Sequence, residues 1–103
     1  MKTIDANELK KLKAQDDVLI VNTLPEDKFE STEIPDAVNV PQEDPDFVEK
    51  VEKIAGGKSK PVVVYCASES CHSSDKAASK LEKAGYQEVY DFAAGAEGWR
   101  QVS

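Results

Sequence analysis

The stretch VVVYCASESCHSSDKAASKL (residues 62–81) begins with an apolar run and ends with a segment of helical periodicity. Short apolar runs are typical of strands buried on both faces of a parallel sheet, so the sequence predicts a strand over residues 61–66. The helix that follows is expected to end at Ala84 and to be capped by a side chain at positions 73–75. Both cysteines of the chain and its only histidine lie between these two elements.

Short apolar runs and amphipathic segments alternate along the rest of the chain. Further strands are predicted near residue 4 and over residues 18–21, 37–40 and 88–92. Helices are predicted over residues 6–14, 45–55 and, for a single turn, within 24–31. Such alternation is typical of parallel strands joined by right-handed crossovers. The sequence therefore predicts one α/β domain over residues 1–103, with a central parallel sheet of about five strands and helices on both faces.

Polar residues and glycines mark where these helices begin and end. Asp5 is the predicted N-cap of the first helix, and Glu8 completes a capping box. Asp44 is the predicted cap of the next long helix, which Gly56 ends. After the last strand, the sequence predicts a glycine-bearing turn that leads to Trp99, which is expected to be a packing residue.

The composition argues against several kinds of partner. The chain has 103 residues, of which 13 are basic and 20 acidic, so nucleic acid and anionic membranes are not expected as partners. No apolar run approaches the roughly 20 residues of a membrane-spanning helix, and the N-terminus lacks the apolar centre of a signal peptide. The expected location is the cytoplasm, where the two cysteines are expected as thiols. Arg100 is the only arginine, so an anion site must depend on backbone N–H groups.

Cys66 is the candidate nucleophile of the chain. It ends a predicted buried strand shortly before a helix begins, so loop N–H groups and the helix N-terminus are expected to favour an anion beside it. A thiolate is such an anion, and it is the reactive form of cysteine. We therefore hypothesise that the pKa of Cys66 is lowered. The alternative is that Cys66 is a small buried apolar residue without reactivity.

Cys71 and His72 leave several interpretations open. Cys71 is a candidate resolving thiol that closes a disulfide with Cys66, or else a residue that packs at the edge of the loop. The C-x4-C spacing differs from the C-x-x-C spacing of dithiol oxidoreductases. His72 is expected to be solvated, and no metal site is expected, because a structural zinc site needs four ligands. His72 also occupies the arginine position of a C-x5-R phosphatase loop, which argues against phosphoryl transfer.

Segments along nearly the whole chain resemble the rhodanese-like domain family, of the single-domain sulfurtransferase type. The family's HIPGA-x-N-x-P segment corresponds to EIPDAVNVP (33–41), and its VVYC strand and active loop begin at residues 63–66. Its AA-x-x-L-x-x-x-G-[FY]-x-x-V-Y pattern matches residues 77–90, and its closing GG-x-x-x-W turn appears as AGAEGW (94–99). The chain differs from the family at NTL (22–24), where the family has D-x-R. Its active loop is also longer and lacks arginine, and is similar to that of a subgroup with an extended C-x4-C loop.

This resemblance implies an enzyme that transfers sulfane sulfur through a persulfide on Cys66. The implied substrate-binding loop consists of Ala67, Ser68, Glu69, Ser70, Cys71, His72 and Ser73. The implied donors are polysulfide, a persulfide, a protein persulfide or thiosulfate, the acceptor is a thiol or cyanide, and no cofactor is implied. Glu69 is expected to repel dianionic donors, so polysulfide or a protein persulfide is expected to react better than thiosulfate. The alternative is a non-catalytic sulfur carrier or redox-regulatory module that switches between a Cys66–Cys71 dithiol and disulfide.

Overall fold

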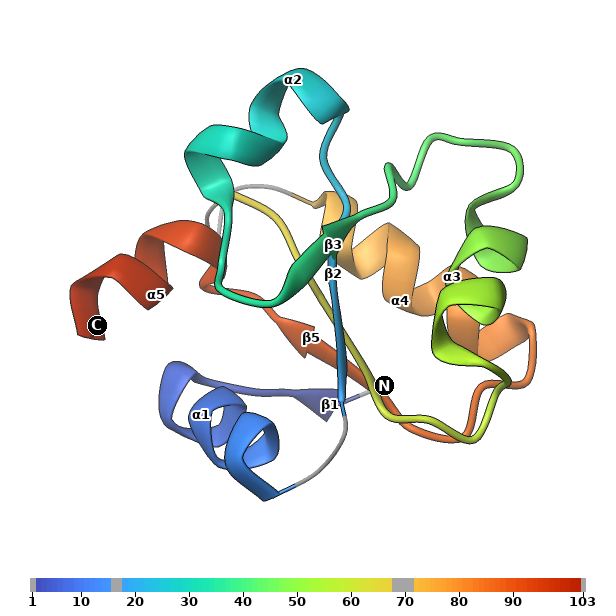
Figure 1. Cartoon of the computed structure of the whole chain (residues 1–103), viewed down its shortest axis with the longest axis horizontal. Coiled ribbons are helices and arrows are strands. Elements are labelled where there is room, and N and C mark those ends of the chain that lie inside the picture. Colours follow the sequence, from blue (N-terminus) through green and yellow to red (C-terminus); the bar gives the residue numbers. More distant parts are fainter. Residues whose placement is uncertain (1, 16–17, 68–71, 103) are drawn as a thin grey trace.

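In the part of the chain that the structure describes (residues 2–15, 18–67 and 72–102), five parallel strands form the central sheet of the computed structural model (Figure 1). The strands are β1 (Lys2–Thr3), β2 (Leu19–Asn22), β3 (Ala37–Asn39), β4 (Val62–Tyr65) and β5 (Val89–Phe92). Their order across the sheet is β1-β5-β4-β2-β3. The predicted α/β class and parallel sheet are therefore confirmed.

Helices cover both faces of this sheet, as predicted. They are α1 (Ala6–Gln15), α2 (Glu26–Phe29) with the short 3-10 helix η1 (Glu30–Thr32), α3 (Phe47–Ala55), α4 (Ser73–Lys83) and α5 (Gly95–Val102). Helices α3 and α4 pack on one face, whereas α1 and α5 pack on the other (Figure 1). Among the described residues, no helix has the length and apolar character needed to cross a bilayer.

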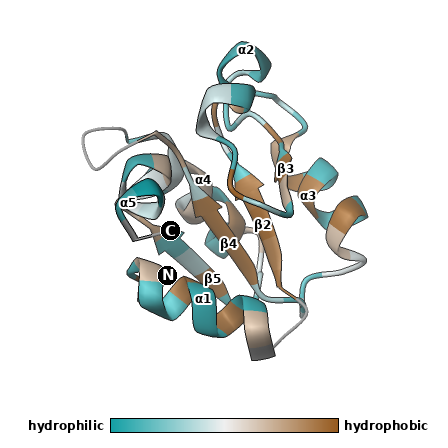
Figure 2. Ribbon diagram, turned by 60° about the vertical axis from the view of Figure 1, so that its left-hand side comes forward, coloured by the Kyte–Doolittle hydropathy of each residue, from teal (hydrophilic) through white to brown (hydrophobic). Residues whose placement is uncertain are grey.

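The strand β4 contributes to two separate cores because successive side chains of a strand point to opposite faces. Val62 and Val64 pack with α3 and α4, whereas Val63 and Tyr65 pack with α1 and α5. All four side chains are buried. Figure 2 shows that β2 and β4 are largely apolar, as expected for central strands that are covered on both sides.

The predicted start and capping box of α1 are confirmed, and the helix ends one residue later than predicted, at Gln15; the predicted cap of α3 is not confirmed. The Glu8 N–H donates to Asp5 Oδ1 at 2.8 Å and the Asp5 N–H donates to Glu8 Oε1 at 3.4 Å, which forms the capping box. The α3 helix begins after Asp46 rather than after Asp44. The Asp44 carboxylate instead accepts a hydrogen bond from the Asp46 N–H at 2.8 Å, so it stabilises a turn that precedes the helix. Gly56 ends the helix in a left-handed conformation (φ 80°), as predicted.

The α5 helix lies where the sequence predicted only a turn. Glycine has a low helix propensity, and α5 contains two glycines. Tertiary contacts outweigh this preference, because the Trp99 side chain packs against the α1 and α5 core and lies beneath the ammonium groups of Lys10 and Lys13. At Gly98 a Cβ atom would come within 2.4 Å of the Ala94 Cβ, so this position has no room for a side chain. The expected packing role of Trp99 is confirmed.

Candidate functional site

Cys66 lies immediately after β4, at the edge of the sheet where the carboxyl ends of the parallel strands meet. It is 0% exposed, yet neither apolar core, as far as the structure describes them, includes it. Its Sγ atom instead contacts the Ser74 hydroxyl group, with 3.7 Å between Sγ and Oγ. Cys66 is therefore fully buried but has a polar neighbour at the N-terminus of α4.

The N-terminus of α4 is built from His72, Ser73 and Ser74. The helix begins at Ser73, and His72 is the residue at the N-cap position, without a side-chain cap hydrogen bond. None of the residues 73–75 is the N-cap, so that prediction was wrong. The His72 side chain is exposed, as expected, and its Nδ1 lies 3.7 Å from Asp75 Oδ2. Backbone N–H groups at this end of an 11-residue helix favour negative charge near Cys66.

Backbone hydrogen bonds fix the chain on both sides of Cys66. The Thr23 N–H and hydroxyl groups, at the end of β2, both donate to the Tyr65 carbonyl at 3.1 Å. The first turn of α5 supplies two further donors: the Ala96 N–H to the Cys66 carbonyl at 2.9 Å, and the Glu97 N–H to the Ala67 carbonyl at 3.0 Å. The unexpected α5 helix therefore holds the start of the cysteine loop in place.

Tyr65 joins the sheet to the segment that follows η1. Its hydroxyl group donates to the Thr32 carbonyl at 2.9 Å and accepts from the Ile34 N–H at 3.0 Å and from Asn22 Nδ2 at 3.1 Å. Asn22 stands in the NTL segment that departs from the family pattern. Its Oδ1 accepts from the Leu24 N–H at 2.9 Å, so this buried amide organises the loop after β2.

Asp91 is a candidate site residue that the sequence reasoning missed. It lies on β5 opposite Val64, and it is only 1% exposed. Burial raises its pKa from the ordinary value of 3.8 to about 6, with a further contribution from Asp75 that the Ser74 hydroxyl partly offsets. A carboxylate in the middle of the predicted strand EVYDF (88–92) was the available signal, because polar groups in buried strands need a reason to be there.

The variant Asp91→Asn is expected to be more stable than the wild type at pH 8 by about 2 kcal/mol, but nearly equal to it at pH 4. A carboxyl group whose pKa is higher in the folded state stabilises that state below its unfolded pKa, and this contribution is lost as the pH rises to about 6 and above. Urea unfolding of both proteins at the two pH values measures the difference. A stability gain that is the same at both pH values contradicts the assignment.

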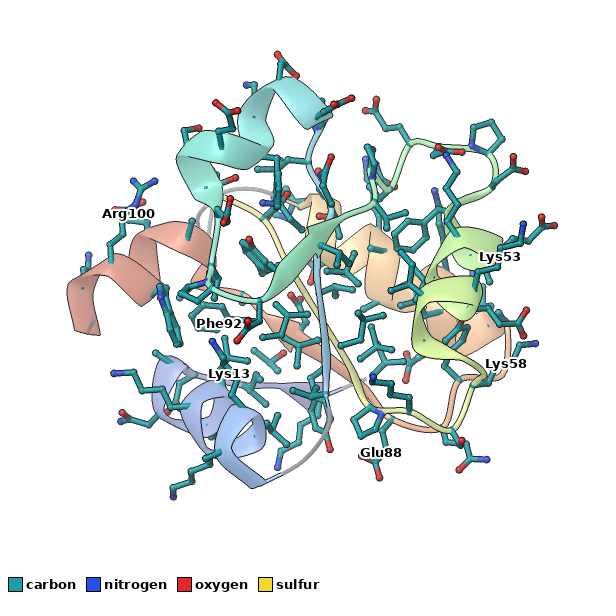
Figure 3. All side chains as sticks on the ribbon, viewed as in Figure 1. Lys13, Lys53, Lys58, Glu88, Phe92 and Arg100 are labelled. Carbon is teal, nitrogen blue, oxygen red and sulfur yellow. The ribbon has the colours of Figure 1, made fainter. Side chains whose placement is uncertain are left out.

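Four residues of the predicted binding loop, Ser68, Glu69, Ser70 and Cys71, lie outside the described residues. The Cys66–Cys71 disulfide and the repulsion by Glu69 therefore stay predictions. Arg100 lies on α5, and its Nη2 donates to the Ser31 carbonyl, so its guanidinium group is engaged with η1 (Figure 3). Among the described residues, no three His, Cys, Asp or Glu side chains are grouped closely enough to hold a metal ion.

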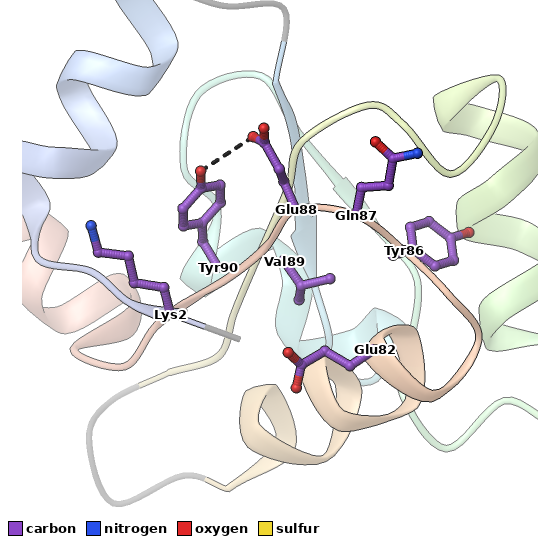
Figure 4. A pocket seen from close by; sticks show the side chains of 7 residues that line it. All are labelled: Lys2, Glu82, Tyr86, Gln87, Glu88, Val89 and Tyr90. Carbon is purple, nitrogen blue, oxygen red and sulfur yellow. Dashed lines mark hydrogen bonds between the residues drawn. The ribbon is translucent and has the colours of Figure 1, made fainter.

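A shallow pocket of about 280 Å³ lies at the opposite edge of the sheet from Cys66 (Figure 4). Its lining includes Val89 and Lys2, which begin β5 and β1, and Tyr90, whose hydroxyl group donates to Glu88. Amino ends of parallel strands seldom form active sites. The chemistry suggested by the sequence is therefore expected at the carboxyl edge of the sheet, away from this pocket.

Comparisons with known proteins agree with the fold described above. The family model described as the rhodanese-like domain matches residues 5–102. Among solved structures, the chain is similar to thiosulfate sulfurtransferase from Pseudomonas aeruginosa (24% identity, TM-score 0.83), with 99% of this chain and 19% of that one covered. It is also similar to a rhodanese-like domain from Anabaena sp (22% identity, TM-score 0.82, 100% and 76% covered). A third similar structure is the human single-domain sulfurtransferase TSTD1 (15% identity, TM-score 0.82, 100% and 98% covered).

At these identities, the structural similarities establish the fold alone. A comparison with curated proteins finds no match.

Proposed function

The chain belongs to the rhodanese-like domain family, and we propose that it is a sulfurtransferase in which Cys66 carries the transferred sulfur as a persulfide. The observation that carries this proposal is the position of Cys66 after β4, with its sulfur 3.7 Å from the Ser74 hydroxyl group at the N-terminus of α4. A cysteine in this position has the positive end of a helix beside it, which favours the thiolate that attacks a sulfur donor.

The proposed reaction has two steps that balance in atoms and electrons. In the first step, the Cys66 thiolate attacks the sulfane sulfur of a donor, the new S–S bond forms, and the rest of the donor leaves with the electron pair of the broken bond. In the second step, an acceptor thiolate attacks the outer sulfur of the Cys66 persulfide and releases the Cys66 thiolate. No cofactor or metal ion takes part in either step. Because Cys66 is 0% exposed, the donor reaches it only when the groups that cover the sulfur are displaced.

Mass spectrometry of the intact protein after treatment with polysulfide tests the proposal. Wild-type protein and Cys71→Ser are expected to gain the mass of one sulfur atom, and Cys66→Ser is expected to gain none. A loss of two hydrogens in the wild type, without added sulfur, would instead support the redox module that uses a Cys66–Cys71 disulfide. Sulfur addition that is unaffected by Cys66→Ser contradicts the proposal.

Protein persulfides, whose reacting group carries a single negative charge, are expected to be better donors than thiosulfate, by about tenfold or more in kcat/KM. Thiosulfate is a dianion, and the carboxyl groups of Asp75 and Asp91 lie near the α4 N-terminus, with Glu69 in the loop that precedes it. The only arginine of the chain, Arg100, is engaged with Ser31. Steady-state rates with each donor and one thiol acceptor measure the preference. A faster reaction with thiosulfate contradicts this prediction.

A further inference from the structure

The Ser74 hydroxyl group lies between the Cys66 sulfur and the buried carboxyl group of Asp91. Asp91 and Ser74 are both 1% exposed, and the Asp91 carboxyl group forms hydrogen bonds with the side chains of Ser74 and Asp75. The same Ser74 oxygen accepts a hydrogen bond from Cys66 Sγ at 3.7 Å. Because a hydroxyl group donates one hydrogen bond and accepts others, Ser74 connects the thiol and the carboxylate in one hydrogen-bonded chain.

Packing does not explain why a carboxyl group occupies this position. The neighbours of Asp91 on the same face of the sheet are Thr3 on β1, Val89 on β5 and Val64 on β4, and the two valines belong to the apolar core beneath α3 and α4. Asp91 Oδ1 has no hydrogen-bond partner among the described residues. An incompletely satisfied carboxyl group in such surroundings lowers stability, so its presence calls for a role in the neighbouring site.

We propose that Asp91 is a positioning residue for Cys66 that, through Ser74, takes up the thiol proton when the sulfur becomes a thiolate. The inference rests on the proposed function only for the identity of the reactive sulfur. In one arrangement, the Cys66 thiol donates to Ser74 and the Ser74 hydroxyl group donates to the Asp91 carboxylate. In the other, the thiol proton has moved to Ser74 Oγ, the Ser74 proton has moved to Asp91, and the negative charge lies on Sγ. The three groups together carry one negative charge in both arrangements.

The charges around Asp91 favour a single negative charge on this cluster. Within the described residues, the side chains that shift the pKa of Asp91 are Asp75, which raises it together with burial, and Ser74, which lowers it. The strand neighbours of Asp91 on β1 and β4 are uncharged. His72 lies farther out, beside Asp75. A second negative charge on Cys66 is therefore costly while Asp91 is ionised.

The thiolate content of Cys66, measured against pH, tests this inference. The parent protein is Cys71→Ser, in which Cys66 is the only cysteine. The thiolate is followed by its ultraviolet absorbance, which needs no access to the buried sulfur, and by the rate of alkylation with a neutral reagent. In the parent, the thiolate content is expected to be low and nearly flat from about pH 6.5 to about pH 8.5, because the pair holds one charge.

Replacing Asp91 removes the second titrating group from this cluster. With Asp91→Asn, the thiolate content is expected to rise about tenfold per pH unit and to exceed that of the parent by about tenfold or more at pH 8. The matched control is Asp75→Asn, which removes a carboxyl group that is hydrogen-bonded to Asp91 but lies outside the chain from Cys66 through Ser74 to Asp91. In Asp75→Asn, the pH range over which the thiolate content is flat is expected to remain. Its lower limit is expected to move to more acidic pH, because Asp75 raises the pKa of Asp91.

Superimposable profiles for the parent and Asp91→Asn overturn the inference. If Asp91→Asn does not fold, the parent protein alone tests the inference. A thiolate content that rises about tenfold per pH unit from about pH 6.5 to about pH 8.5 shows that Cys66 and Asp91 do not share one charge. The measurement uses no sulfur donor. If the thiolate content is flat with pH but polysulfide does not modify the protein, the inference is supported and the proposed function is contradicted. If the thiolate content rises about tenfold per pH unit and the protein forms the persulfide, the proposed function is supported and the inference is contradicted.

Discussion

Cys66→Ser is expected to lower the rate of sulfur transfer from polysulfide to a thiol acceptor by at least about a thousandfold. A serine hydroxyl group stays protonated at neutral pH, and its oxygen does not form the persulfide on which the second step depends. The steady-state rate of formation of the acceptor persulfide measures this loss. Transfer that remains within tenfold of the wild-type rate contradicts the role of Cys66.

The fold of Cys66→Ser must be intact for this comparison. The substitution keeps the size of the buried side chain and its contact with the Ser74 hydroxyl group, so the thermal unfolding temperature is expected to be close to that of the wild type.

Cys71→Ser separates the two functions that the sequence left open. Sulfur transfer that continues in Cys71→Ser supports the sulfurtransferase, whereas loss of the response in both variants supports a Cys66–Cys71 switch.

The architecture could be predicted because its signals are local. Runs such as VVVY in β4 are too apolar for any position except the centre of a sheet, and the capping box of Asp5 and Glu8 marks the start of α1. The α5 helix could not be predicted in the same way. Its glycines disfavour a helix, and the contacts of Trp99 that stabilise it come from α1, about ninety residues away in sequence.

The candidate site was predictable in part. The position of Cys66 follows from the order of one strand and one helix, which the sequence shows directly. The position of Asp91 near Cys66 depends on the order of strands across the sheet, in which β5 lies beside β4. That adjacency places residue 91 beneath the first turn of α4, and no pattern within β5 reveals it. A buried charge in an apolar strand was the only local sign, and its meaning depends on the neighbouring helix.

Tyr65→Phe is expected to destabilise the protein by roughly 3 kcal/mol and to lower its Tm by roughly 10–20 °C. The Tyr65 hydroxyl group is fully buried and makes hydrogen bonds with the Thr32 carbonyl, the Ile34 N–H and Asn22 Nδ2. Burial raises its pKa, so the hydroxyl group stays protonated and keeps its hydrogen bond to Thr32. Phenylalanine leaves these buried groups without that partner, and each unsatisfied group costs about 1–3 kcal/mol.

The other two tyrosines of the chain are matched controls for the loss of one hydroxyl group. Tyr86 donates to the partly buried Val48 carbonyl at 3.2 Å, so Tyr86→Phe is expected to cost about 1 kcal/mol or less. Tyr90 donates to Glu88 at an exposed site, so Tyr90→Phe is expected to change the stability by less than about 0.5 kcal/mol. Urea unfolding of the three variants therefore ranks them by burial and by the number of hydrogen bonds lost. Equal losses in all three variants contradict the role of the Tyr65 hydroxyl group, because they show that removing any phenol oxygen has the same effect.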